Sequence, residues 1–504
     1  MKGIMIQGTS SDAGKSFITT VFCRLLANEG IKVAPFKSQN MSNNSYVTVD
    51  GSEIGRAQGI QAEAANTEAS VWMNPILLKP KSDQSSEIVL FGKPLRTLSG
   101  MSYREDFYEQ GIDVIKQSLA RLEEAYDAVI MEGAGSPVEI NLKDRELVNM
   151  KVAELADVPV ILVADIERGG IFASIVGTLE LLTPSERKRV KGIIVNKFRG
   201  DIRLFEDGVA WIEERTEIPV LGVIPYINGH MVEGEDSLSL ADRFSDTKKS
   251  SIELAVLKLP YISNYTDIEP FLYEEDVSIR WVEEASAFGK PDALIIPGTK
   301  STIHDLRYLK KTGLAQKVID YYHHDGTIIG ICGGFQMLCE ELIDAEGMDT
   351  GSRQTKEEGL SLIPAKTFFS AEKKTIRTMG SLHSETNLPG NVLLEGYEIH
   401  LGHSVWNTEH GQSPFLVLDK EEEEGFYEEK GRLIGTYLHH LFHNDEWRAL
   451  WLNMLRQKKQ LPPGKTTFMI NEKFKKLDEA VEQIHPFLKW DKVKEIIDGW
   501  GQET

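Results

Sequence analysis

The sequence predicts an α/β protein of two domains, each built on a mostly parallel sheet flanked by helices. Short apolar runs alternate with helical patterns over residues 1–245, which is typical of parallel strands joined by crossover helices. A glycine-rich turn, Gly8–Ser16, stands between the first of these runs and a helical pattern. A second turn, Gly330–Gln336, has the same context in the carboxyl-terminal half of the chain.

The apolar runs of residues 1–245 predict the strands of the first domain. Helix-like stretches, such as 17–28 and 105–126, lie between them. Because strands that alternate with helices form sheets covered on both faces, we expect a doubly wound sheet. The runs are Ile4–Ile6, Val33–Phe36, Ala128–Met131, Val158–Ala164, Ile193–Val195 and Val220–Ile224.

The composition excludes several classes of protein. A chain of 504 residues, 41% of them apolar, is long enough for two or three globular domains. No apolar run approaches a membrane span and no signal peptide opens the chain, so we expect a cytoplasmic protein. Its three cysteines are too few for a disulfide framework or a zinc site. The net charge of −21 argues against nucleic acid and anionic membranes as partners.

The turn after the first apolar run has the features of a phosphate-binding loop. Backbone N–H groups at the start of the helix can hold phosphate oxygens, Lys15 can neutralise charge, and the Ser16 hydroxyl can bind Mg²⁺. Five residues separate Gly8 from Gly14, one more than in the common pattern. This longer form is similar to that of dethiobiotin synthetase and its relatives, which activate carboxylates with ATP. We therefore expect nucleotide contacts from Gly8, Thr9, Gly14, Lys15 and Ser16.

A magnesium nucleotide also needs a carboxylate, and Glu132 stands at the end of the third apolar run. Ligands of open α/β sheets bind at this end of the strands. The same relatives carry Glu-Gly-Ala-Gly here, so the resemblance implies that Glu132 is a Mg²⁺ ligand. Asp50 or Glu53 is expected as a second ligand. Lys37, in the polar loop after the second run, is placed to reach the reacting phosphoryl group.

The turn at Cys332 predicts a reactive thiol. A strand, then Gly-x-Cys-x-Gly, then a helix is the pattern of a nucleophile elbow with Cys in place of Ser. The glycines allow the strained turn, and the helix N-terminus favours a thiolate. His439 can supply the base from a distant part of the chain. Gly298, after another apolar run, could bring a backbone N–H to the oxyanion beside that of Gly333.

These residues resemble the class I glutamine amidotransferases, in the branch whose cysteine motif is Gly-x-Cys-Gly-Gly-x-Gln. The resemblance implies that Cys332 attacks the side-chain amide of glutamine, releases ammonia and leaves a glutamyl thioester. That family normally has a glutamate two positions after its histidine, but residue 441 is Leu. We expect a Cys332–His439 dyad or an orienting group from elsewhere, for which a backbone carbonyl would serve. If the segment is extended, His440 points away from the thiol.

Further motifs resemble the cobyric acid synthases over residues 1–445. Members of that family use ATP and glutamine to amidate a corrinoid during cobalamin biosynthesis. The resemblance implies adenosylcobyrinic acid a,c-diamide as acceptor and four amidations to adenosylcobyric acid. The motifs are Gly55–Gln58 with Gln61, Met73–Pro80, Glu132–Leu142, Arg168–Phe172, Val195–Gly200, Ile262–Asp267 and Gly396–His400.

The resemblance also suggests roles for single residues outside the loops. Asn196, at a strand end, looks like the residue that recognises the adenine edge in this fold. Arg56, Lys79 and Arg168 are the cations that we expect against substrate carboxylates, although arginines without a role are common on surfaces.

Two alternatives remain open from the sequence. One keeps the chemistry and changes the acceptor, as in cobyrinic acid a,c-diamide synthase or the amidation of a cell-wall lipid. The other is a regulatory or partitioning ATPase with an inactive glutaminase-like module. The loop after the second strand and the Arg56 motif favour the corrinoid acceptor, whereas a regulatory ATPase has no use for Cys332, His439 and an oxyanion loop together.

The domain boundaries follow from a change in composition. Polar residues around 244–251 predict a linker. We expect an ATP-dependent amidoligase domain at 1–245, the linker at 246–251, and a glutamine amidotransferase domain at 252–504. The amphipathic helical tail after residue 445 is assigned to the second domain with a packing role only, and acidic Glu421–Glu424 is expected to be a solvated loop.

Overall fold

The computed structural model describes residues 1–82, 85–99, 106–227, 250–389, 392–406 and 413–501. The chain divides into two compact units, Met1–Ser237 with Lys473–Thr504, and Leu238–Glu472. Each contains a mostly parallel sheet flanked by helices, so the predicted fold class is confirmed. Most of the predicted linker at 246–251 lies outside the described residues.

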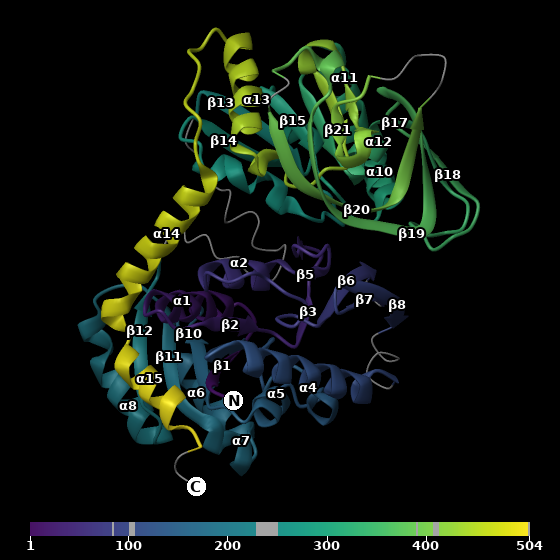
Figure 1. The fold of residues 1–504 in the computed structure, drawn as a ribbon. Helices are drawn as coiled ribbons and strands as arrows, with labels where there is room; N and C mark the ends of the chain where they lie inside the picture. The colour runs from purple at the N-terminus through teal and green to yellow at the C-terminus, as the bar shows by residue number, and fades with distance from the viewer. Residues whose placement is uncertain (83–84, 100–105, 228–249, 390–391, 407–412, 502–504) are drawn as a thin grey trace. The chain divides into compact units, whose positions relative to one another are not determined.

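The main sheet of the first unit has six parallel strands in the order β12-β11-β10-β1-β9-β2 (Figure 1). Each predicted apolar run of residues 1–245 overlaps one of these strands. Their bounds are β1 Gly3–Gly8, β2 Val33–Phe36, β9 Ala128–Glu132, β10 Val160–Asp165, β11 Val190–Phe198 and β12 Val220–Pro225.

Helices cover both faces of this sheet because side chains alternate along each strand. Ile4 and Ile6 of β1 pack in one apolar cluster with helix α1, whereas Met5 packs in another with α4, α5 and α6. The helices are α1 Lys15–Asn28, α2 Arg56–Ala64, α4 Tyr108–Ala125, α5 Met150–Ala156, α6 Ile171–Leu181, α7 Pro184–Arg189 and α8 Glu206–Thr216.

Two small sheets in the first unit were not predicted from the sequence. One has the order β3-β6-β7-β8, and the other pairs β4 with β5. Both draw on the polar stretch that follows β2, where the sequence indicated only a loop. The bounds are β3 Gln39–Met41, β4 Ser45–Val47, β5 Glu53–Gly55, β6 Ile76–Ser82, β7 Ser85–Leu90 and β8 Lys93–Ser99.

The carboxyl-terminal tail belongs to the first unit from Lys473 onward, so its assignment to the second domain was wrong. Helices α14, Met469–Ile484, and α15, Trp490–Gly499, bury their apolar faces in the cluster that contains α1. The Trp490 ring packs against that of Phe22 with centroids 5.1 Å apart. The Lys489 N–H donates to the Leu221 carbonyl of edge strand β12. Burial of this apolar face, each large side chain contributing about 1.5–3 kcal/mol, fixes the tail there.

The second unit has a six-stranded sheet in the order β14-β13-β15-β16-β24-β23, parallel except for the β23–β24 pair. The strands are β13 Ile252–Leu257, β14 Val277–Val282, β15 Ala293–Ile296, β16 Ile328–Ile331, β23 Phe426–Tyr427 and β24 Leu433–Thr436. Its helices are α10 Thr302–Lys311, α11 Leu314–His323, α12 Gly333–Leu338 and α13 Asp445–Lys458.

A second sheet in this unit corrects two predictions. The helix expected after the Cys332 turn is short and ends at Leu338, because Cys339–Asp344 forms strand β17 between β18 and β19. The acidic stretch expected to be a solvated loop includes strand β22, and its last residue, Glu424, is buried. The remaining strands are β18 Thr355–Glu358, β19 Ile363–Leu382, β20 Leu393–Trp406, β21 Leu416–Leu418 and β22 Glu422–Glu424.

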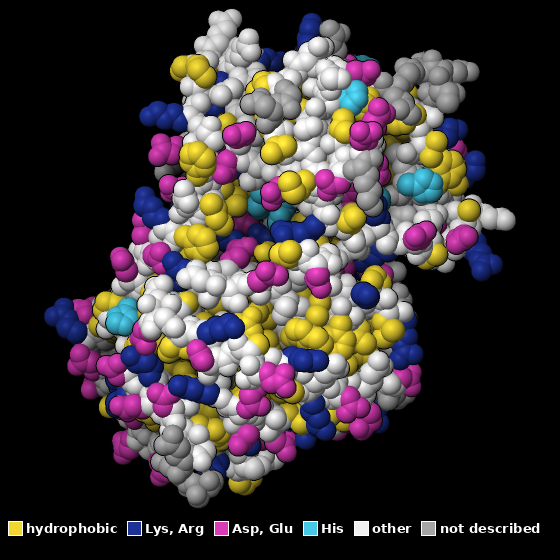
Figure 2. All heavy atoms as spheres, in the orientation of Figure 1, with side chains coloured by type: hydrophobic (Ala, Val, Ile, Leu, Met, Phe, Trp, Pro, Cys, Tyr) yellow, Lys and Arg dark blue, Asp and Glu magenta, His cyan; other side chains and the backbone are white. Residues whose placement is uncertain are grey.

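The surface carries charge of both signs. Figure 2 shows basic and acidic side chains interspersed over the visible face of the first unit. Within the part of the chain that the structure describes, no helix is both long enough and apolar enough to cross a membrane.

Candidate functional site

Cys332 lies on a strained turn between β16 and α12. Its φ of 52° and ψ of −108° are in a region that residues with a side chain rarely adopt. Its N–H donates to the Thr436 carbonyl at 2.7 Å, and its carbonyl accepts from the Gln336 N–H at 3.0 Å. A Cβ on Gly334 would lie 2.0 Å from the Ile296 carbonyl oxygen, so the tight turn requires glycine there. This is the geometry of a nucleophile elbow.

His439 is fully buried and is oriented by a carboxylate that the sequence did not single out. Its Nδ1 lies 2.7 Å from Asp267 Oδ2, and Asp267 Oδ1 accepts the His440 N–H at 2.8 Å. The orienting group therefore comes from elsewhere in the fold, one of the two expected possibilities, and it is a carboxylate rather than a backbone carbonyl. The Ile262–Asp267 motif contained this residue, but no local spacing linked it to a histidine 172 positions away.

The charge of Asp267 favours the protonated, imidazolium form of His439. Burial opposes the charge on the ring, but the charge of Asp267, its hydrogen bond and the nearby Cys332 together raise the pKa of His439 to about 10. A protonated ring next to the sulfur stabilises the thiolate, which is the nucleophilic form of cysteine.

Backbone and ring contacts fix the imidazole further. His439 and Tyr397 exchange backbone hydrogen bonds at 2.9 and 3.3 Å, and their rings stack with centroids 5.1 Å apart. The side-chain amide of Asn264 lies 3.4 Å from His439 Nε2. Neither Tyr397 nor Asn264 was predicted to belong to the site.

The neighbouring residues differ in their roles. Strand β24 ends at Thr436, so the alternation expected of an extended segment does not apply at His440. His440 instead has a positive φ of 65° and stacks on His443 with ring centroids 4.0 Å apart. Leu441, at the position of the usual glutamate, is buried in the apolar core.

Of the two glycines predicted for the oxyanion, Gly298 lies against His439, whereas Gly333 follows Cys332 in the chain and lies against Thr299. A Cβ on Gly298 would be 3.1 Å from His439 Cε1, and one on Gly333 would be 2.6 Å from Thr299 Cγ2. Hydrogen bonds hold the loop, among them that from Thr299 Oγ1 to Asp305 at 2.5 Å and that from the Ser263 N–H to the Gly298 carbonyl at 2.9 Å. The structure thus brings Cys332, His439 and both glycines together, while the oxyanion role of the glycines stays a prediction.

In the first unit, three side chains converge on Glu132 at the end of β9. Ser16 Oγ and Lys37 Nζ lie 2.8 and 3.0 Å from Oε1, and Gln61 Nε2 lies 2.6 Å from Oε2. Burial acts to raise the pKa of Glu132, but Lys37, Gln61 and Ser16 outweigh it, so the pKa lies below its usual range. The predicted residues Ser16, Lys37 and Glu132 therefore form one cluster, and Gln61 is an addition to it.

The phosphate-loop geometry depends on Gly14 and Asn196. Gly14 caps α1 with a φ of 98°, and a Cβ there would lie 2.0 Å from Asn196 Nδ2. Asn196 Nδ2 donates to the Ala13 carbonyl at 2.9 Å, so this side chain supports the loop backbone. Lys15 Nζ lies 3.2 Å from the Ser10 carbonyl oxygen. Gly8 is the last residue of β1, and the Thr9 N–H donates to Val163.

The expected substrate cations lie in different surroundings. Lys79 is buried and forms an ion pair with Glu53, and its Nζ lies 2.8 Å from Ser45 Oγ. Arg56 is also buried, with its guanidinium 5.7 Å from the Tyr46 ring centroid. The Arg168 side chain is 65% exposed and pairs with Asp12 at 3.3 Å.

The residues around Glu132 fit a hard divalent cation. A hydroxyl and a carboxylate, Ser16 and Glu132, are oxygen donors of the kind that Mg²⁺ accepts together with water and phosphate. No cluster of three or more His, Cys, Asp or Glu suited to a metal occurs among the described residues. Asp50 is exposed and bonds within its own turn to Thr48 and Ser52, and no contact joins it to this described cluster.

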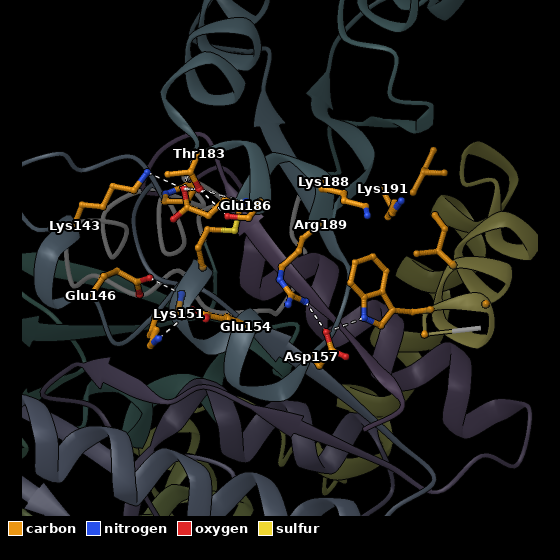
Figure 3. A pocket seen from close by; sticks show the side chains of 18 of the residues that line it. Lys143, Glu146, Lys151, Glu154, Asp157, Thr183, Glu186, Lys188, Arg189 and Lys191 are labelled. Carbon is orange, nitrogen blue, oxygen red and sulfur yellow. Dashed lines mark hydrogen bonds and ion pairs between the residues drawn. The ribbon is translucent and has the colours of Figure 1, made fainter. Parts of the chain in front are cut away.

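A cavity of about 1000 Å³ in the first unit lies by the amino-terminal ends of β11 and β12, whereas Glu132 is at the carboxyl end of its strand (Figure 3). Its lining includes Pro219, just before β12, and Trp500 of the tail. Three ion pairs border it: Lys143–Glu186 at 2.8 Å, Lys151–Glu154 at 3.0 Å and Arg189–Asp157 at 2.9 Å. Because ligands of open α/β sheets bind beyond the carboxyl ends of strands, the phosphate loop is the better candidate for ATP.

Comparison with known proteins finds a known domain in each half of the chain. Residues 4–232 match the CobQ/CobB/MinD/ParA nucleotide binding domain, and residues 253–447 match the CobB/CobQ-like glutamine amidotransferase domain. The chain is 46% identical over 501 residues to a cobyric acid synthase of Geobacillus kaustophilus, covering 99% of this chain and 98% of that one. The chain belongs to the cobyric acid synthase family. A family member from Synechocystis is 46% identical over 467 residues, covering 93% of this chain and 92% of its own. As a member of this family, the chain is a glutamine-dependent amidoligase.

Proposed function

We propose that this cobyric acid synthase family member amidates corrin side-chain carboxylates, converting adenosylcobyrinic acid a,c-diamide to adenosylcobyric acid. The observation that carries the proposal is the near full-length similarity to cobyric acid synthases. This chain carries both functions that the reaction needs. Ammonia would be released by Cys332 with His439 and Asp267, and the carboxylate would be activated at the phosphate loop.

The first half of the reaction activates the acceptor. A corrin carboxylate oxygen attacks the γ-phosphorus of ATP, ADP leaves, and an acyl phosphate forms. Lys15 and Lys37 stabilise charge on the transferred phosphoryl group, because positive groups aimed at developing charge lower the barrier. Ser16 and Glu132 would hold Mg²⁺, which supplies Lewis-acid neutralisation of the phosphate oxygens when bound. Substrate carboxylates would be bound by Arg56, Lys79 and Arg168, for which Lys79 would have to leave Glu53. A second Mg²⁺ ligand would be Asp50, and the adenine edge would be recognised by Asn196.

The second half supplies nitrogen. The Cys332 thiolate attacks the side-chain amide carbon of glutamine, and the proton on His439 passes to the leaving ammonia. Backbone N–H groups of Gly298 and Gly333 stabilise the oxyanion, and water then hydrolyses the thioester to glutamate. Ammonia attacks the acyl phosphate, phosphate leaves, and the amide remains.

Mass spectrometry of the corrinoid tests the proposal. The purified protein, incubated with MgATP, glutamine and adenosylcobyrinic acid a,c-diamide, should replace one hydroxyl by one amino group per turnover until four carboxylates have reacted. Cobyrinic acid and a lipid-linked cell-wall precursor serve as competing acceptors. Preferential amidation of either competitor would refute the acceptor assignment, and glutamine hydrolysis without any amidation would favour a regulatory role. A cytoplasmic location stays a prediction from the composition.

A further inference from the structure

Glu398, on strand β20 of the second unit, has an ionised and buried side chain with one unsatisfied oxygen. Its Oε2 lies 3.1 Å from His400 Nε2 and 2.6 Å from Lys374 Nζ. Burial acts to raise the pKa of Glu398, but His400 and Lys374 outweigh it and the pKa lies below its usual range. Oε1 is buried and has no hydrogen-bond partner among the described residues. A buried carboxylate oxygen without a donor is energetically unfavourable, so this position suits a donor that a ligand brings.

The residues on either side of Glu398 contact the catalytic pair. The carbonyl oxygen of Ile399 lies 3.8 Å from the sulfur of Cys332. The ring of Tyr397 stacks on that of His439. A substrate whose amide carbon reaches the sulfur therefore has its remaining atoms near this short stretch of β20.

His400 connects Glu398 to Tyr437 and, through it, to helix α12. Its ring stacks on Tyr437 with centroids 4.1 Å apart, and the Tyr437 hydroxyl lies 3.5 Å from Gln336 Nε2. Gln336 lies in α12, which begins directly after Cys332. Glu398 is thus connected through His400 and Tyr437 to Gln336 in α12, the helix that follows Cys332.

We propose that Glu398 Oε1 accepts a hydrogen bond from the α-ammonium group of glutamine and selects the free amino acid as nitrogen donor. This inference rests on the glutaminase function of the Cys332 site. An ammonium group offers three N–H donors and a positive charge, which match an ionised acceptor shielded from water. Neither the amide nor the α-carboxylate of glutamine provides that charge. Glu398 is therefore a specificity residue, and the chemistry at the sulfur does not need it.

The test compares glutamine with glutaramate, which is glutamine without its α-amino group. In Glu398→Gln, kcat/KM for glutamine hydrolysis should fall about 100-fold, mostly through KM, because the charge partner of the ammonium is removed. The value for glutaramate should stay within about threefold of wild type, since that substrate has no ammonium group to lose. Inhibition by glutamate and by glutarate gives the same comparison without turnover, and Ki should rise for glutamate alone.

Glu422→Gln is the matched control, because Glu422 pairs with Lys374 at 3.0 Å and leaves the Lys374–Glu398 ion pair in place. It should leave the preference for glutamine over glutaramate unchanged. Glu398→Asp keeps the charge and should retain part of that preference. It replaces Glu398→Gln in the test if that variant proves unstable. Equal losses for both substrates, or no loss for glutamine, would overturn the proposal. If the wild-type protein did not hydrolyse glutamine at all, the function of the site itself would be wrong, which is a separate result.

Discussion

The two candidate sites are built in different ways. The Cys332 site has one nucleophile on a strained turn and a buried His439–Asp267 pair that orients its base. The Glu132 site contains no comparable nucleophile among its assembled residues, and Ser16, Lys37 and Gln61 surround a single carboxylate. A covalent site requires a few groups at fixed positions, whereas phosphoryl transfer depends on the field of many charges. Substitutions should therefore affect different steps at the two sites.

Removing the nucleophile should have the largest effect. Cys332→Ser should lower glutamine-dependent synthesis by at least about 10³-fold, because no thioester can form efficiently. Synthesis from added ammonium salts should remain near wild type. Both rates can be measured by corrinoid mass under saturating MgATP. Loss of both activities together would contradict the separation of the two sites.

Charge removal at the phosphate site should affect both nitrogen sources. Lys15→Ala or Glu132→Ala should reduce synthesis from glutamine and from ammonia by about 10²- to 10³-fold, because the transferring phosphoryl group loses stabilisation. Glutamine hydrolysis assayed alone is the control for folding of the other site. A variant that makes product from ammonia at the wild-type rate would show that phosphate transfer occurs elsewhere.

The orienting pair should matter only for glutamine. His439→Ala and Asp267→Asn should each lower glutaminase activity by about 10²-fold or more and spare ammonia-dependent synthesis. His440→Ala should be mild because its contribution to the pair is a backbone N–H, and Leu441→Ala should act through packing. Equal losses for His439 and His440 would contradict this assignment.

The same pair makes a prediction about pH. The folded pKa of His439, about 10, lies above its ordinary 6.5, so the pair stabilises the fold fully below about pH 6.5 and less as pH rises through 10. The difference in unfolding free energy between wild type and Asp267→Asn should shrink over that window.

The carboxyl-terminal tail follows the second unit in sequence but packs on the first. Trp490→Ala should destabilise the first unit by about 3–5 kcal/mol, since a buried indole and its contacts with Phe22 and Glu29 are lost. Thermal unfolding and ammonia-dependent synthesis should both change, whereas glutamine hydrolysis should persist. An effect on glutaminase alone would assign the tail to the other unit.

Glu424 should give the smallest effect. Burial and the charge of Glu398 raise its pKa to about 8, whereas hydrogen bonds from the Tyr437 N–H and the Thr436 hydroxyl oppose this rise. A carboxyl with a raised folded pKa loses stability as pH increases from its ordinary value through 8. Glu424→Gln should therefore stabilise the protein above pH 8 by on the order of 1 kcal/mol, measured by denaturant unfolding. A stabilisation that does not change with pH would contradict the buried-carboxyl explanation.

The sequence alone determined the features that depend on adjacent residues. The strands of the first main sheet, the phosphate loop before α1 and the elbow at Cys332 follow from apolar runs and glycines close together in the chain. Glu132 was also identified, because the end of a strand is a local signal. These features arise from backbone preferences and burial patterns within about ten residues.

Only the tertiary structure decided which distant side chains meet. Asp267 orients His439 across 172 positions, Glu53 binds Lys79, and the tail after Lys473 returns to the first unit. The strand at Cys339–Asp344 and the buried Glu424 depend on pairing with remote segments. Ion pairs and sheet ladders form where the folded chain brings two groups within a few ångströms of each other. The separation of two residues along the sequence does not predict that distance.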